Sequence, residues 1–188
     1  MIRMWYNSVH ERIDLMGMNH IYCGNGKGKT TAAVGLAVRA AGAGMRVHII
    51  QFLKASASSE LNALASVPGI TVERLEKDHG FAFMMNDQQK LETAQRHDEM
   101  LRNAKELISR SEIDMLILDE FTDAYELGLL DKKLADSVAL RHYDCVELII
   151  TGRKPSPEYF SQAYYISEIQ SVRHPYENGC AARKGIEF

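Results

Sequence analysis

The sequence predicts an α/β protein, a single domain with a mainly parallel sheet and helices on both faces. Short β-type runs alternate with helix-like stretches along the chain, which is the pattern of a parallel sheet with crossover helices. The first of these runs also ends in a glycine-rich turn that leads directly into a helix. With 188 residues, 46% of them hydrophobic, the chain can bury a core of its own without disulfides.

Six segments have the composition of strands. The fourth is almost continuously apolar, as a strand covered by helices on both faces should be. The predicted strands cover residues 20–23, 46–52, 70–75, 114–119, 145–150 and 164–169. Ligands of such sheets bind at the carboxyl ends of the strands, so we expect the functional residues just after positions 23, 52, 119 and 150.

Four segments are predicted to be helices: residues 30–41, 58–65, about 87–109 and 132–141. The first is rich in alanine and is ended by Gly42 and Gly44. The long third helix can be capped by Asn86 or Asp87. Its predicted apolar face consists of Leu91, Ala94, Leu101, Ala104 and Ile108.

Composition limits the classes of partner and the compartment. A formal net charge of −3 gives no general cationic field, so nucleic acid is not an expected partner. Cys23, Cys145 and Cys180 are far apart and form no metal or disulfide pattern, which favours a reducing cytoplasm. No apolar run approaches the ~20 residues of a membrane span, and the charged N-terminal segment is no signal peptide.

The glycine-rich turn has the features of a phosphate-binding loop, and its residues read GNGKGKTT. Backbone N–H groups and the following helix N-terminus would hold phosphate oxygens, the lysine would reach distal phosphates, and the threonine hydroxyl would meet Mg²⁺. The loop is one residue shorter than GxxxxGK[ST]. The alternative is a glycine-rich turn with incidental lysines. The candidate residues are Gly24, Asn25, Gly26, Lys27, Gly28, Lys29, Thr30 and Thr31.

A second acidic element is expected for a magnesium ion that bridges phosphates, and Asp119 and Glu120 end the fourth predicted strand. Successive strand residues point to opposite sides, so spacing alone leaves open which carboxylate reaches the ion. The alternative is a solvated acidic pair. The chain has no kinase signature and no obvious base, so phosphate binding is predicted more strongly than ordinary phosphoryl transfer.

Several segments together resemble the P-loop family of ATP:corrinoid adenosyltransferases. They are the GNGKGKTTAAVGLAVRAAG run, the QF after the second strand, LDE, TGR and the ending HPY...G...KGIEF, so the likeness extends from about Ile21 to Phe188. The resemblance implies a P-loop NTPase-like (RecA-like) fold. It also implies transfer of the 5′-deoxyadenosyl group of ATP to the cobalt(I) of a corrinoid, with release of triphosphate.

The resemblance also implies roles for individual residues. Gly24 to Thr30 would bind the phosphates, Lys29 would neutralise the leaving group, and Thr30 and Glu120 would hold Mg²⁺. Asn25 and Arg39 would contact the nucleotide, which this family holds reversed relative to ordinary P-loop enzymes. A solvated position on the helix is the alternative for Arg39.

A loop with two aromatic residues, often GFTW, packs under the corrinoid ring in this family and excludes the lower axial ligand. The corresponding string here is HGFAF, in which Phe81 matches and Phe83 stands where Trp is common. His79 lies nearby as a competing cobalt ligand. Without the resemblance, core packing would be the favoured interpretation of Phe81 and Phe83.

The resemblance further implies a homodimer and an electron-donating flavoprotein partner. Residues 1–18 are expected to form an N-terminal segment that covers the corrinoid site of a neighbouring subunit, and residues 19–188 the adenosyltransferase domain. Leu53, Lys54, Ala55 and Arg153 receive no role. Two other functions stay open at this point: an ATPase or small-molecule kinase that uses the same loop, and a nucleotide or corrinoid binding protein without turnover.

Overall fold

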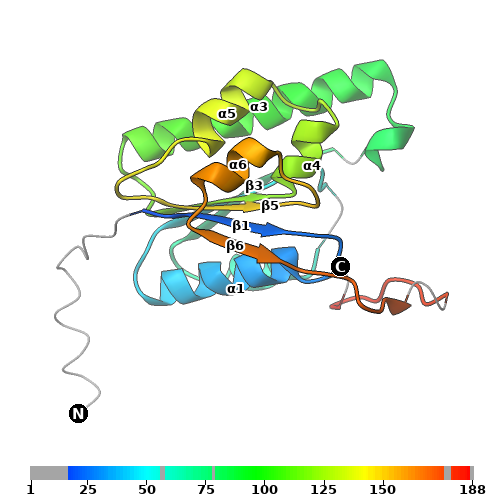
Figure 1. The fold of residues 1–188 in the computed structure, drawn as a ribbon, viewed down its shortest axis with the longest axis horizontal. Helices are drawn as coiled ribbons and strands as arrows, with labels where there is room; N and C mark the ends of the chain where they lie inside the picture. Colours follow the sequence, from blue (N-terminus) through cyan, green and yellow to red (C-terminus); the bar gives the residue numbers. More distant parts are fainter. Residues whose placement is uncertain (1–16, 56–57, 78, 176–178, 187–188) are drawn as a thin grey trace, which may run out of the picture.

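A computed structural model describes residues 17–55, 58–77, 79–175 and 179–186. The described chain forms one six-stranded sheet in the order β3-β2-β4-β5-β1-β6, and all five neighbouring pairs are parallel. Helices cover both faces of this sheet (Figure 1). The predicted fold class is therefore confirmed. No helix in the described ranges combines the length and apolar character that a membrane span requires.

All six predicted strands form, each with ends within two residues of the expected ones. They are β1 (Asn19–Cys23), β2 (Val47–Gln51), β3 (Ile70–Arg74), β4 (Met115–Asp119), β5 (Glu147–Thr151) and β6 (Tyr165–Glu168). The four predicted helices also form, as α1 (Lys29–Gly42), α2 (Glu60–Leu64), α3 (Asp87–Ser109) and α5 (Lys132–Ala139). Not predicted were α4 (Phe121–Glu126), α6 (Pro157–Gln162) and the 3₁₀ turn η1 (Ala82–Met84), which are too short to show a helical period.

The core lies in two layers, one on each face of the sheet. On the face below the sheet in Figure 1, Ala33 and Ala37 of α1 pack against Ile49 and Ile117. On the opposite face, α3, α5 and α6 cover a larger cluster that includes Leu118 of β4. Because alternate residues of β4 enter the two clusters, the strand is buried throughout, as its continuous apolar sequence predicted.

Helix α3 begins at the predicted cap, but its buried face differs from the predicted one. The side chain of Asn86 accepts the Gln89 N–H and the Gln89 side chain accepts the Asn86 N–H, both at 2.9 Å, which is a capping box. The prediction for Leu91 was wrong, since it is 52% exposed. Polar Thr93 and His97 lie on the buried face of the helix. A prediction based only on the positions of apolar residues therefore missed part of this face.

His97 is a wholly buried histidine that joins α3 to two loops. Its Nδ1 lies 2.7 Å from the Leu129 carbonyl oxygen, and the Leu53 N–H lies 3.3 Å from its Nε2. A carbonyl can only accept and an N–H can only donate, so these partners select one neutral tautomer. Burial lowers the pKa of His97 to about 4, against the carbonyl contact, which acts in the opposite direction.

Stability should therefore depend on pH through His97. Its folded pKa lies below the unfolded value of 6.5, so between pH 6.5 and 4 the unfolded chain binds the extra proton. The free energy of unfolding should fall by about 3 kcal/mol as the pH drops through this window, and be constant with respect to His97 above it. Urea unfolding at a series of pH values measures the slope.

The variant His97→Gln should be less stable at pH 7 and should lose that part of the slope. His142→Gln, at an exposed histidine, serves as the matched control and should keep it. An unchanged pH dependence in His97→Gln would contradict this account of His97.

Candidate active site

The carboxyl ends of β1, β2, β4 and β5 lie at one edge of the sheet, where the sequence placed the site. The loop of residues 24–28 connects β1 to α1 at this edge, so the N-terminal end of α1 adds partial positive charge there. Gly24 (φ +102°) and Gly28 (φ +125°) adopt backbone conformations that favour glycine. A Cβ on Gly24 would also lie 2.4 Å from the Ile169 carbonyl oxygen. The close approach of Ile169 therefore leaves no room for a side chain at position 24.

Lys29 points into the loop. Its ammonium donates hydrogen bonds to the carbonyl oxygens of Gly24, at 2.8 Å, and Gly26, at 3.0 Å, and the residue is only 8% exposed. Because α1 begins at Lys29, the ammonium and the helix N-terminus concentrate positive charge at one point. This geometry suits an anionic ligand with several phosphates.

Asp119, at the end of β4, is the centre of the polar network. The hydroxyls of Thr30 and Thr151 each donate to its Oδ1 at 2.8 Å, and the Lys54 ammonium donates to its Oδ2 at 2.7 Å. The Asp119 carboxylate is 1% exposed. One buried carboxylate thus joins the start of α1, the turn after β2, and the ends of β4 and β5.

Glu120 follows Asp119 in a left-handed backbone conformation, with φ +58°. Its N–H donates to the Thr151 hydroxyl at 2.9 Å, which fixes the backbone at this unfavourable geometry. Burial, and then the Asp119 carboxylate, raise the pKa of Glu120. Of the two adjacent carboxylates, it is Asp119 that accepts the hydrogen bond from the Thr30 hydroxyl. The assignment of a metal ion to Glu120 stays a prediction.

The other predicted nucleotide residues lie around the loop or farther away. Lys27 donates to the Ile186 carbonyl oxygen at 2.5 Å, so it contacts the C-terminal segment. Asn25 accepts the Ser171 N–H at 3.0 Å, and Thr31 is exposed.

Arg39 is exposed on α1, nine residues after Thr30, which corresponds to roughly 14 Å along the helix. Its guanidinium is close enough to Tyr22 to lower the pKa of that phenol, although burial makes the net shift upward. The structure does not bring Arg39 next to the phosphate loop, and its contact with the nucleotide stays a prediction.

Phe81 and Phe83 form an exposed aromatic pair, so the alternative of ordinary core packing is wrong. They are 70% and 82% exposed, and their rings stack with centroids 5.5 Å apart and planes 10° apart. Met84, which is 68% exposed, extends this apolar surface. The pair flanks the start of η1, in the connection from β3 to α3. Such a surface is suited to covering a flat apolar ligand or a partner.

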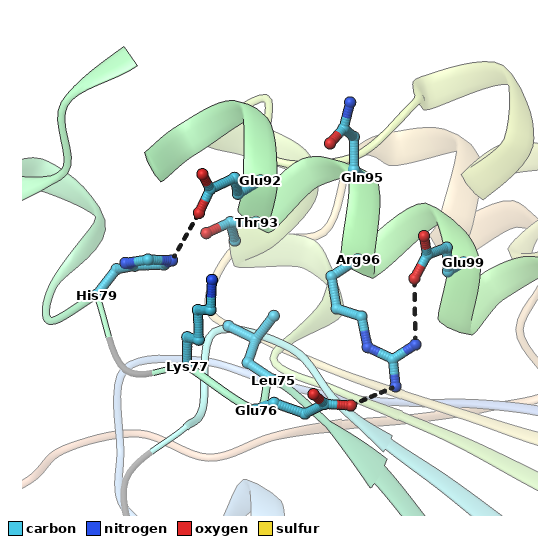
Figure 2. Close-up of a pocket in the computed structure, with 9 residues that line it drawn as sticks. All are labelled: Leu75, Glu76, Lys77, His79, Glu92, Thr93, Gln95, Arg96 and Glu99. Atoms are coloured by element: carbon cyan, nitrogen blue, oxygen red, sulfur yellow. Dashed lines mark hydrogen bonds and ion pairs between the residues drawn. The ribbon is translucent and has the colours of Figure 1, made fainter. Parts of the chain in front are cut away.

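Two cavities adjoin these segments. One, of about 240 Å³, lies between the segment after β3 and α3, and Figure 2 shows His79 pointing toward Glu92 at its edge. The His79 Nε2 is 3.6 Å from the Glu92 carboxylate, so this histidine has a protein partner. The second, of about 440 Å³, lies beside the phosphate loop at Gly24, Asn25 and Arg153.

Sequence reasoning assigned no role to Lys54 and Arg153, yet both lie at the phosphate loop. The Arg153 carbonyl oxygen accepts the Gly24 N–H at 3.1 Å, and the Lys54 ammonium is 3.2 Å from the Thr30 hydroxyl. The available signal was their position: each follows a predicted strand by a few residues, at the edge where the ligand was expected.

Proteins of known name are similar to this chain over most of its length. "Corrinoid adenosyltransferase" is the name of a Pseudomonas aeruginosa protein that is 31% identical over 180 residues, covering 93% of this chain and 85% of the relative. The Escherichia coli K12 protein of the same name is 32% identical over 182 residues, 96% of this chain and 90% of its own. Corrinoid adenosyltransferase CobA of Salmonella typhimurium is 30% identical over 174 residues, with 92% and 86% covered.

Among solved structures, the cytoplasmic domain of EssC matches 90% of this chain and 38% of its own, with a TM-score of 0.47 and 17% identity, which is too distant to bear on function. The family model "ATP:corrinoid adenosyltransferase BtuR/CobO/CobP" matches residues 16–188. That range contains every strand and helix described above, the phosphate loop and the exposed aromatic pair, and so the chain belongs to the ATP:corrinoid adenosyltransferase family.

Proposed function

We propose that this protein transfers the 5′-deoxyadenosyl group of ATP to the cobalt(I) of a reduced corrinoid, as an enzyme of cobalamin metabolism. The observation that carries the proposal is that one chain has both a phosphate loop and an exposed aromatic surface. Its relatives named corrinoid adenosyltransferase are similar to it over most of their length. The cobalt electron pair forms the Co–C5′ bond, the C5′–O bond breaks, and triphosphate leaves with the electrons of that bond.

This reaction explains why the described site has phosphate-binding groups without an evident base. Cobalt(I) has no proton to remove, so the protein must position C5′ and stabilise the charge that develops on triphosphate. Lys29, fixed inside the loop, supplies a charge-assisted donor for that purpose. The backbone N–H groups at the start of α1 add partial positive charge.

The residues at Thr30 fit a magnesium ion. The Thr30 hydroxyl, Asp119 and Glu120 offer the hard oxygen ligands that Mg²⁺ prefers. The described residues contain no group of three or more His, Cys, Asp or Glu side chains that could hold a metal ion alone, which suits an ion completed by phosphate oxygens and water. We assign Thr30 and Glu120 as its protein ligands, with Asp119 orienting Thr30. When bound, Mg²⁺ would supply charge neutralisation to the leaving triphosphate.

Phe81 and Phe83 would cover the lower face of the corrinoid and exclude an axial ligand. Both rings are exposed and stacked in parallel, so they present apolar area to a ligand and are not part of the protein core. Because both rings are exposed, we expect another segment to supply further cover for a corrinoid bound on this surface.

The expected cover, residues 1–18, lies almost wholly outside the described residues. The domain division, 1–18 and 19–188, remains part of the proposal, as do a homodimer, a flavoprotein electron donor and a cytoplasmic location. Deletion of residues 1–17 would test the cover, because it should weaken corrinoid binding more than ATP binding. Light scattering would test the dimer.

Product analysis tests the function directly. Wild-type protein, ATP, Mg²⁺ and a panel of chemically reduced corrinoids should yield triphosphate and a corrinoid-dependent change in absorbance. Formation of ADP and phosphate with an unchanged corrinoid would instead identify an ATPase or kinase. Binding of ATP without any product would identify a binding protein.

Replacing Lys29 by alanine should lower the rate of adenosyl transfer by about a hundredfold, or about 3 kcal/mol of transition-state stabilisation. Single-turnover kinetics would measure this loss. Lys133→Ala, at an exposed lysine of α5, is the matched control and should be as active as wild type. A loss of less than threefold in Lys29→Ala would exclude the assigned role.

Replacing both Phe81 and Phe83 by alanine should raise the corrinoid Kd about tenfold or more and leave the ATP Kd unchanged. Because both rings are exposed, the free energy of unfolding should change by no more than about 0.5 kcal/mol. Leu91→Ala, at another exposed apolar side chain, is the control for both affinities. Equal losses of ATP and corrinoid affinity would contradict a corrinoid-specific role for the pair.

A further inference from the structure

Lys54 is held at the phosphate site by an unusual turn. Leu53, the residue before it, has a left-handed backbone with φ +58°, which is unfavourable for a residue with a Cβ. The neutral imidazole of His97 accepts the Leu53 N–H, and the Arg74 guanidinium donates to the Lys54 carbonyl oxygen at 3.3 Å. Contacts on both sides of the Lys54 Cα therefore hold the turn in place.

The ammonium of Lys54 lies against the Thr30 hydroxyl, a proposed magnesium ligand, and against Asp119, the carboxylate that orients Thr30. It is 2.7 Å from Asp119 Oδ2 and 3.2 Å from Thr30 Oγ1. Asp119 is almost fully buried, and a buried carboxylate requires a compensating charge. Lys54 provides that charge in the structure described here, at the place where the proposed magnesium ion would meet Thr30.

Lys54 differs from Lys29 in its freedom to change partners. Lys29 is 8% exposed and is bound by two loop carbonyls, whereas the Lys54 side chain is 27% exposed and ends on a flexible four-carbon stem. A phosphate oxygen near the Thr30 hydroxyl would be within reach of this stem after a rotation of the side chain.

We infer that Lys54 is a second lysine of the triphosphate site, and that its ammonium exchanges partners when nucleotide binds. Without nucleotide it is paired with Asp119 and Thr30. With Mg²⁺ and a triphosphate present, the divalent ion would occupy the position beside the Thr30 hydroxyl and balance the charge of Asp119, and the ammonium would pair with a phosphate oxygen. This inference rests on the proposed function, since it requires the triphosphate to lie at Thr30.

The exchange predicts opposite effects of Lys54→Met on two ligands. Inorganic tripolyphosphate with saturating Mg²⁺ should bind about tenfold more weakly, because one charge-assisted contact is lost. Mn²⁺ alone should bind about tenfold more tightly, because the positive charge that Lys54 places beside Thr30 and Asp119 has been removed. Titration calorimetry measures the first affinity, and electron paramagnetic resonance of free Mn²⁺ measures the second.

Two further variants make the result specific. Lys54→Arg keeps the charge and should bind tripolyphosphate within about threefold of wild type, which also serves if Lys54→Met folds poorly. Lys133→Met removes an exposed charge far along the chain and should leave both affinities unchanged.

An unchanged tripolyphosphate affinity or an unchanged Mn²⁺ affinity in folded Lys54→Met would overturn the exchange, and would reduce Lys54 to a structural ion pair. Equal weakening of tripolyphosphate binding in Lys54→Arg and Lys54→Met would overturn it as well. These binding measurements need no corrinoid. If wild type forms no triphosphate from ATP, the transferase proposal fails by itself, whereas unchanged affinities with an active wild type reject the role of Lys54 alone.

Discussion

The buried carboxylate of Asp119 is the interaction on which the site depends. Burial of a charge is unfavourable unless partners surround it, and Asp119 receives two hydroxyl donors and one ammonium. Those donors come from α1, β5 and the turn after β2, three segments that are far apart in the sequence. The hydrogen bonds that this one buried carboxylate needs therefore hold the start of α1, and with it the phosphate loop, against the carboxyl end of the sheet.

Backbone strain is concentrated at the same edge. The described residues include three non-glycine residues with positive φ. Leu53 lies two residues after the end of β2, Glu120 directly follows β4, and Ser111 lies elsewhere. Leu53 and Glu120 are fixed by hydrogen bonds that their N–H groups donate, to His97 Nε2 and to the Thr151 hydroxyl. Strain supported by buried partners in this way is typical of functional sites, because it aims side chains that a relaxed turn would leave in solvent.

The two substrates demand different surfaces, and the chain separates them. A triphosphate needs local positive charge, which in a protein of net charge −3 would come from a few lysines and the start of α1. A corrinoid needs apolar area, which the exposed Phe81 and Phe83 would offer, on the connection between β3 and α3, under the proposed function. Because both rings are exposed, a corrinoid bound on them would need further cover from another segment or subunit, as proposed.

Local sequence determined the strands, the longer helices and the phosphate loop, because each depends on neighbours in the chain. Continuous apolar runs predicted buried strands, Asn86 or Asp87 predicted the start of α3, and GNGKGKTT predicted a glycine-rich turn between the first strand and a helix. The buried face of α3 was predicted only in part, because Thr93 and His97 are buried as hydrogen-bonded polar residues that an apolar count overlooks.

Tertiary structure alone decided which carboxylate meets Thr30 and which groups Lys54 contacts. Asp119 and Glu120 are adjacent, and only the pairing of β4 with its neighbours and the direction of α1 turn Asp119 toward the loop. Lys54 reaches the same carboxylate across 65 positions of sequence, through a turn held by His97. Such contacts depend on the orientation of segments brought together by folding, and no local pattern of residues encodes that orientation.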